Sequence, residues 1–247
     1  MTNKLVKKIL ATVVLAMVGA SASAAPIFWT DWTGDNTAQS GFQGNGTITT
    51  NTATIGVTYT NPIGVGFYQT SGGIDYWTGG SGPTSPYTST AVDNRPTGTD
   101  IIALRYLGTQ TLTFSEAIAN PVFAFASLNG NGYAFDRDFD LLSLGGVDGN
   151  ACGYWGCGGA TKVVVDMGGG VFQYRLNSTG GEPHGALQFR GAFNSVTWLS
   201  TSNEYWNGFT VGVQGTAREV GIPEPASLAL FGFGIAALLA TRRRKPL

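Results

Sequence analysis

The sequence predicts an all-β protein, an antiparallel β-sandwich or jelly roll, on the basis of three observations. Runs rich in Val, Ile, Thr and aromatic residues recur about every eight to twelve residues, separated by Gly, Asn and Pro. No segment between the chain ends has the apolar period of a long amphipathic helix. Charged residues make up only 12% of the chain, against about 25% in a typical globular protein, while glycine contributes 37 residues.

The expected strands follow one another along the chain without an internal repeat. In residues 209–213, for example, Phe209, Val211 and Val213 share one face, as the two-residue period of a strand requires. Leu107-Gly108 is expected to form a tight turn between two strands, and residues 116–119 a single helical turn. The other strands are expected at residues 47–60, 101–106, 109–114, 121–127, 161–166, 171–176, 186–189 and 194–200.

Residues 71–94 break this pattern, because they are rich in Gly, Ser, Thr and Pro and show little periodicity. We expect a long loop or an excursion at the edge of a sheet. Tyr76, Trp77 and Tyr87 lie in it, and their exposure would bear directly on any binding role.

The N-terminal residues have the features of an export signal. Three lysines precede a short apolar run at residues 9–20, and Ala22 and Ala24 supply the small residues that a signal peptidase reads. We therefore expect a signal helix over residues 1–24, cleaved after Ala24. Cleavage after Ala25 would leave a proline at the mature N-terminus, and an uncleaved anchor helix would call for a longer apolar run.

The C-terminal residues contain three blocks in a strict order. The tripeptide Pro223-Glu224-Pro225 is followed by an uncharged stretch at residues 226–241 and then by a basic cluster, Arg242, Arg243, Arg244 and Lys245. As a helix, the 16 residues of the stretch would span roughly 24 Å, less than the ~30 Å hydrocarbon core of a bilayer. Such a helix can still cross a membrane if the bilayer thins or the arginines snorkel, with the basic cluster on the cytoplasmic side.

This order of blocks resembles the PEP-CTERM family of sorting signals over residues 222–247, through the proline-flanked glutamate and the terminal basic cluster. The resemblance implies recognition by an exosortase, a multi-pass transpeptidase-like membrane enzyme, and removal or exchange of the tail, as with a GPI signal. It also implies a Gram-negative bacterium that makes exopolysaccharide or biofilm matrix. The protein would be held briefly in the inner membrane, facing the periplasm, before it reaches the cell surface or the matrix. A plain single-pass anchor is the alternative.

Between the two signals, residues 25–221 are expected to form one β-sandwich ectodomain of 197 residues, enough to bury a real core. This part carries seven basic and fourteen acidic residues, a net charge of −7. An acidic surface argues against nucleic acid and against anionic membrane surfaces as partners. It is compatible with a neutral polysaccharide or with divalent cations.

The two cysteines, Cys152 and Cys157, are expected to form a disulfide that closes the loop 153–156 in an oxidising compartment. A metal site would need two further ligands nearby. A redox-active pair usually has two intervening residues, whereas this pair has four.

Asp136, Asp138 and Asp140 are the candidate metal ligands. In a strand their carboxylates would line one face, and three like charges need a compensating cation. Calcium accepts carboxylate oxygens in flexible geometry, so a structural Ca²⁺ site is one hypothesis. The alternative is a solvated acidic face in which Arg137 pairs with one of the aspartates.

Two aromatic pairs, Tyr154 with Trp155 and Tyr205 with Trp206, are candidates for a carbohydrate-stacking platform. The alternative is that they belong to the core of the sandwich.

No catalytic set is visible in the sequence. Glu182 and the single histidine, His184, flank a proline and are not expected to converge, and no nucleophile motif or phosphate-binding loop is present. The chain is therefore expected to be a non-catalytic envelope or matrix protein linked to exopolysaccharide or biofilm. A carbohydrate-binding module is the alternative, and nothing points to a polysaccharide hydrolase.

Overall fold

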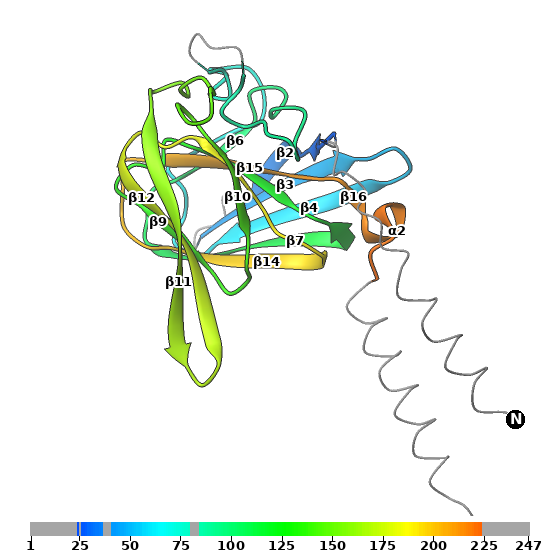
Figure 1. The fold of residues 1–247 in the computed structure, drawn as a ribbon. Helices are drawn as coiled ribbons and strands as arrows, with labels where there is room; N and C mark the ends of the chain where they lie inside the picture. Colours follow the sequence, from blue (N-terminus) through cyan, green and yellow to red (C-terminus); the bar gives the residue numbers. More distant parts are fainter. Residues whose placement is uncertain (1–23, 25, 37–40, 80–83, 224–247) are drawn as a thin grey trace, which may run out of the picture.

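The computed structural model describes residues 24, 26–36, 41–79 and 84–223, which form two antiparallel sheets packed face to face (Figure 1). The predicted all-β class is therefore confirmed. The expected signal peptide and the expected transmembrane helix at residues 226–241 lie outside the described residues. Within the part that is described, no helix is long and apolar enough to cross a membrane.

The smaller sheet has seven strands, in the spatial order β10, β13, β8, β15, β6, β5, with β1 beside β15. Its strands are β1 (Phe28–Trp29), β5 (Phe67–Gln69), β6 (Ile101–Leu104), β8 (Val122–Ala126), β10 (Asp140–Leu144), β13 (Gly185–Gln188) and β15 (Asn207–Val213).

The larger sheet has nine strands, in the order β11, β12, β9, β14, β7, β4, β3, β2, with β16 beside β7. Its strands are β2 (Asp31–Asn36), β3 (Phe42–Thr49), β4 (Thr54–Asn61), β7 (Gly108–Ala119), β9 (Gly132–Phe135), β11 (Gly158–Gly168), β12 (Val171–Gly181), β14 (Ala192–Ser200) and β16 (Gly215–Thr216).

A single-turn helix, α2 (Ala217–Val220), follows β16 and leads toward the C-terminal tail. Thr216 caps it and forms a capping box with Glu219, and Gly221 ends it with a left-handed φ of 72°. Thr216, Glu219 and Gly221 have the spacing of a capping box followed by a C-terminal glycine, but the helix is too short to show an apolar period.

The main core lies between the sheets and is rich in aromatic side chains. The ring of Trp198 in β14 lies 5.4 Å from that of Phe123 in β8 and 5.1 Å from that of Phe209 in β15. Phe209 is buried in this cluster together with Val211 and Val213, as their alternation predicts. The rings pack edge to face, which aromatic pairs prefer.

Three local predictions are wrong. Residues 47–60 form two strands of a hairpin, β3 and β4, because residues 50–53 turn the chain back. Leu107-Gly108 does not close a hairpin, because β6 belongs to the smaller sheet and β7 to the larger one, so the chain crosses between layers here. Residues 116–119 end β7, where pairing with β14 and β16 overrides a local helical tendency.

Residues 71–94 are largely without strands, as predicted, but Trp77 and Tyr87 are fully buried. They cover the outer face of the smaller sheet, where Val122, Ala124 and Ala186 point away from the main core. The Trp77 Nε1 donates a hydrogen bond of 3.0 Å to the carbonyl oxygen of Asp100, which satisfies its buried N–H. This loop therefore forms a second, smaller core.

Candidate functional site

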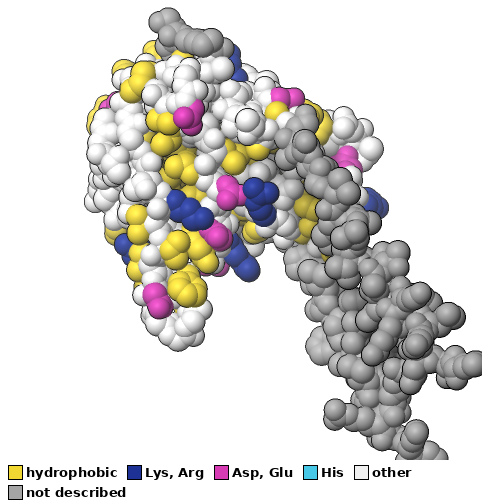
Figure 2. All heavy atoms as spheres, viewed as in Figure 1, with side chains coloured by type: hydrophobic (Ala, Val, Ile, Leu, Met, Phe, Trp, Pro, Cys, Tyr) yellow, Lys and Arg dark blue, Asp and Glu magenta, His cyan; other side chains and the backbone are white. Residues whose placement is uncertain are grey.

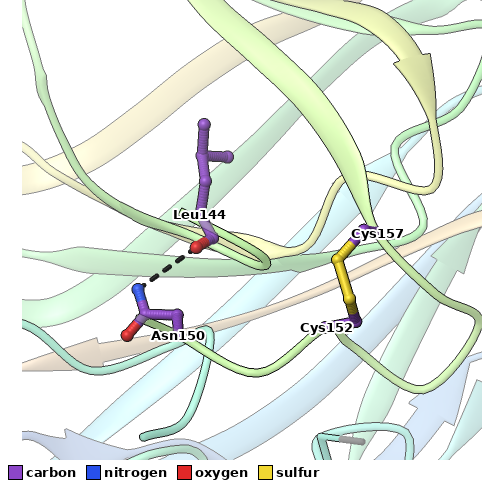
Figure 3. The surroundings of a disulfide bond; sticks show 4 residues. All are labelled: Leu144, Asn150, Cys152 and Cys157. Carbon is purple, nitrogen blue, oxygen red and sulfur yellow. Dashed lines mark hydrogen bonds between the residues drawn. A yellow bond between two sulfur atoms is a disulfide. The ribbon is translucent and has the colours of Figure 1, made fainter. Parts of the chain in front are cut away.

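The predicted disulfide between Cys152 and Cys157 is confirmed, with a Cα–Cα distance of 4.7 Å (Figure 3). Backbone hydrogen bonds of 3.0 and 3.1 Å between Gly153 and Gly156 tighten the enclosed loop. Just before the disulfide, the Nδ2 of Asn150 donates to the carbonyl oxygen of Leu144 (Figure 3). The loop is therefore tied to the end of β10, and it presents Tyr154 and Trp155 to solvent.

Five aromatic side chains from four segments form one cluster of contacting rings, which we call the aromatic platform: Phe67, Tyr76, Tyr154, Trp155 and Trp206. The ring centroids of Trp206 lie 5.1 Å from Tyr76, 5.2 Å from Phe67 and 6.3 Å from Trp155. Tyr154 links the loop to the rest, at 5.2 Å from Tyr76. Trp155 and Tyr154 are 51% and 40% exposed, whereas Phe67, Tyr76 and Trp206 are half-buried against the second core, so the loop residues are the part most open to a ligand.

The structure brings three of the four predicted aromatic residues together and leaves out the fourth. Tyr205 is 82% exposed, and its ring lies 5.9 Å from the guanidinium carbon of Arg105. Tyr205 lies at a bend just before β15, and its ring contact is with Arg105 and not with the platform. Tyr205 instead lines an open hollow of about 480 Å³ beside Tyr106 and Glu204.

His184 lies directly beneath the disulfide loop. Its side chain is fully buried, and its Nδ1 lies 3.0 Å from the hydroxyl oxygen of Tyr87. A Cβ added to Gly153 would lie only 2.0 Å from the His184 Cγ, so the loop backbone rests on the imidazole ring. Burial lowers the pKa of His184 to about 4, and the ring is therefore neutral at pH 7.

Two carboxylates that the sequence did not pair with each other, Glu182 and Glu204, lie at the end of the sandwich opposite the start of the tail. Glu182 accepts hydrogen bonds from the hydroxyl of Ser127 and, at 2.5 Å, from the Nδ2 of Asn129. Glu204 accepts one of 2.9 Å from the Nδ2 of Asn207. Burial first, and then the charge of Glu182, raise the pKa of Glu204 to about 8. No sequence motif could have revealed this pair, because the two residues come from different loops.

Asp136, Asp138 and Asp140 do not line one strand face, because residues 136–139 form the bend between β9 and β10. Asp138 pairs with the Nζ of Lys162, and Asp140 pairs with the Nε of Arg190 at 2.5 Å. Across the described ranges of the chain, no group of three His, Cys, Asp or Glu side chains is placed to hold a metal ion. The calcium hypothesis stays a prediction.

Near these ion pairs, a groove of about 580 Å³ runs beside the start of β14. Asp138 and Asp140 line one part of it, and Ile222 and Pro223 line another. Pro223 is exposed, so the tripeptide of the C-terminal tail begins at the surface of the domain. Glu224, Pro225 and the basic cluster lie outside the described residues.

Residues 221–245 match the family model of the PEP-CTERM protein-sorting motif, as the resemblance implied. No curated protein and no solved structure matches the chain. The matched residues begin at Gly221, which ends α2. The chain therefore carries a PEP-CTERM sorting signal at residues 221–245, which implies export and sorting to the cell envelope by an exosortase-like membrane enzyme.

Proposed function

We propose that this protein is a non-catalytic component of the cell surface or extracellular matrix that binds exopolysaccharide through the aromatic platform. Its tail at residues 226–241 would hold it in the inner membrane, with the domain in the periplasm, until the sorting enzyme cuts or exchanges the tail. The sorting motif supports the route, and the platform is the observation that carries the binding role.

The platform suits a sugar ligand for two reasons. Sugar rings present C–H faces that stack on aromatic rings, and an exposed apolar cluster on a secreted protein generally marks a binding surface. The disulfide and the packing on His184 also hold Tyr154 and Trp155 in place before a ligand arrives. A preorganised surface loses little conformational entropy on binding.

The net charge of the domain supports a neutral ligand. With fourteen acidic and seven basic residues, the domain would repel a strongly acidic polymer. A biofilm role follows if the bound polymer is the matrix that the producing cell secretes.

For binding, we expect Trp155→Ala to weaken retention of the purified full chain on the producer's own exopolysaccharide by about tenfold, since an exposed aromatic anchor is worth more than about 1 kcal/mol. Retention is measured by pull-down in mild detergent. Tyr205→Ala is the matched control, because it removes a more exposed aromatic ring that lies outside the platform.

Equal retention of the two variants would remove the platform from the proposal, and no retention of the wild type would end the binding role. Release of reducing sugar from the same polysaccharide would contradict the non-catalytic assignment. The Glu182 and Glu204 pair would then be the first residues to substitute.

For processing, we expect an epitope tag placed after Leu247 to be missing from the mature protein in cells that have the sorting enzyme. Cells that lack this enzyme are the control and should keep the tag on a membrane-bound form. A tag that stays on the mature protein in both kinds of cell would favour a plain anchor.

A further inference from the structure

The hairpin of β11 and β12 reaches beyond the strand that supports it. β12 pairs with β9 only from Tyr174 to Asn177, while its pairing with β11 continues to Val171 and Gly168. The last residues before the turn at 168–170 therefore lack a third strand over a length of roughly 10 Å, at about 3.3 Å per residue. Figure 1 shows this hairpin projecting from the domain.

The unsupported tip of the hairpin carries several exposed apolar side chains. Phe172 is 44% exposed, and Met167 and Val171, which are 57% and 60% exposed, lie near the turn. Val164, which is 53% exposed, lies just behind the tip, opposite Tyr174. Asp166 is the charged residue between Val164 and Met167. Figure 2 shows hydrophobic side chains exposed along the hairpin. Exposed apolar side chains gathered at one place generally mark a contact surface.

The strand register places this tip at the same end of the larger sheet as the start of the tail. Trp198 in β14 pairs with Phe135 in β9, and Phe135 pairs with Tyr174 in β12. β12 and β14 are both antiparallel to β9, so they run in the same direction. The tip of the hairpin therefore lies toward the end of the sheet at which β14 begins, at Ala192. The groove beside the start of β14 also holds Pro223.

A direct contact joins the hairpin to the same groove. The Nζ of Lys162 in β11 donates 2.6 Å to the carbonyl oxygen of Phe139, and it pairs with Asp138, which lines the groove. The part of the hairpin around Lys162 is therefore fixed to the groove that Ile222 and Pro223 also line.

The sequence of the tail determines what lies on this side of the domain. Only Glu224 and Pro225 separate Pro223 from the apolar stretch at residues 226–241. Three residue steps cover at most about 10 Å. If that stretch enters the bilayer, as the proposed function holds, the lipid surface lies next to this end of the domain and within reach of the hairpin.

We propose that the apolar tip of the β11–β12 hairpin, formed by Met167, Val171 and Phe172, docks into the lipid surface while the tail is anchored there. This contact would be a second, reversible attachment that orients the domain before the tail is cut. It would be apolar, because the tip carries no Lys or Arg, and it therefore needs no anionic lipid.

The full chain, reconstituted in phosphatidylcholine vesicles, tests this inference. Met167→Cys is labelled with an environment-sensitive dye, and a second sample carries the dye at Ile63→Cys. Ile63 is a matched control because it is 55% exposed and lies against Gly108, at the opposite end of β7 and β14. The two natural cysteines are bonded to each other, so the introduced thiol reacts alone.

We expect a quencher carried on the lipid chains to reduce the dye signal at position 167 several-fold more than the signal at position 63. Equal quenching at the two positions would overturn the hairpin inference. Emission at position 167 that shifts with protein density but is not quenched by lipid would also overturn it, because a second copy of the chain would then cover the tip.

Flotation of the vesicles separates this inference from the proposed anchor. If the protein floats with the vesicles while position 167 stays unquenched, the result contradicts the hairpin contact but not the anchor. Protein that does not float would overturn both the anchor and the contact that depends on it.

Discussion

Gly153→Ala is expected to destabilise the protein by about 2 kcal/mol and to abolish retention on exopolysaccharide. The new methyl group would lie 2.0 Å from the Cγ of the buried His184, so either the imidazole or the disulfide loop must move. The loop is at the surface and the imidazole is packed in the interior, so the loop should yield and take Tyr154 and Trp155 with it. Urea unfolding and the polysaccharide pull-down measure the two effects.

Gly34→Ala is the control for this substitution. A Cβ at Gly34 would have nothing within 4 Å, and the change should alter the free energy of unfolding by less than about 0.5 kcal/mol. If Gly153→Ala kept both the stability and the binding of the wild type, the packing of the loop on His184 would not position the platform.

His184 should make the protein sensitive to acid. Burial lowers the pKa of His184 in the folded state to about 4 from its ordinary value of 6.5. Below pH 6.5 the unfolded chain takes up a proton that the folded chain does not. The contribution of the neutral His184 to the free energy of unfolding is therefore fully present above pH 6.5. This contribution is lost as the pH falls toward 4, by about 3 kcal/mol in total.

The comparison that isolates this effect is the wild type against His184→Gln, unfolded in urea at pH 7 and at pH 4.5. Glu204 acts in the opposite direction, because its pKa is raised to about 8 and the folded state gains stability as the pH falls from 8 toward 4.5. This contribution is common to both proteins and cancels in their difference. A wild type that loses no more stability than His184→Gln would show that the histidine is not held neutral.

Strands with a regular alternation were predictable, because their burial is decided within a few residues. In β14, the alternate residues Val196, Trp198 and Ser200 are buried in the structure. The connection between β6 and β7 was not predictable in this way. Leu107-Gly108 has the local character of a turn, but the choice between folding back and crossing to the other sheet depends on partners that are distant in the sequence.

The candidate site shows the same division. The disulfide loop was predictable from two cysteines with two aromatic residues between them. Its grouping with Trp206 was proposed only because both segments carry aromatic residues. Tyr76 and Phe67 complete the platform from two other segments, and only the packing of the smaller sheet brings them there. The burial of Trp77 and Tyr87 likewise depends on an apolar outer sheet face that a local pattern cannot reveal.

The sequence by itself determined the route of this protein and its fold class. Sorting enzymes recognise a contiguous segment, and a strand is identified by its two-residue period. The sorting signal and the strands can therefore both be recognised from short stretches of the sequence. Only the tertiary structure decided which aromatic rings meet, which carboxylate loses its charge, and that the apolar hairpin points to the end where the tail begins. Each of these depends on the pairing of strands that are far apart in the chain. The stabilising contacts form between different segments, so the sequence of one segment cannot predict them.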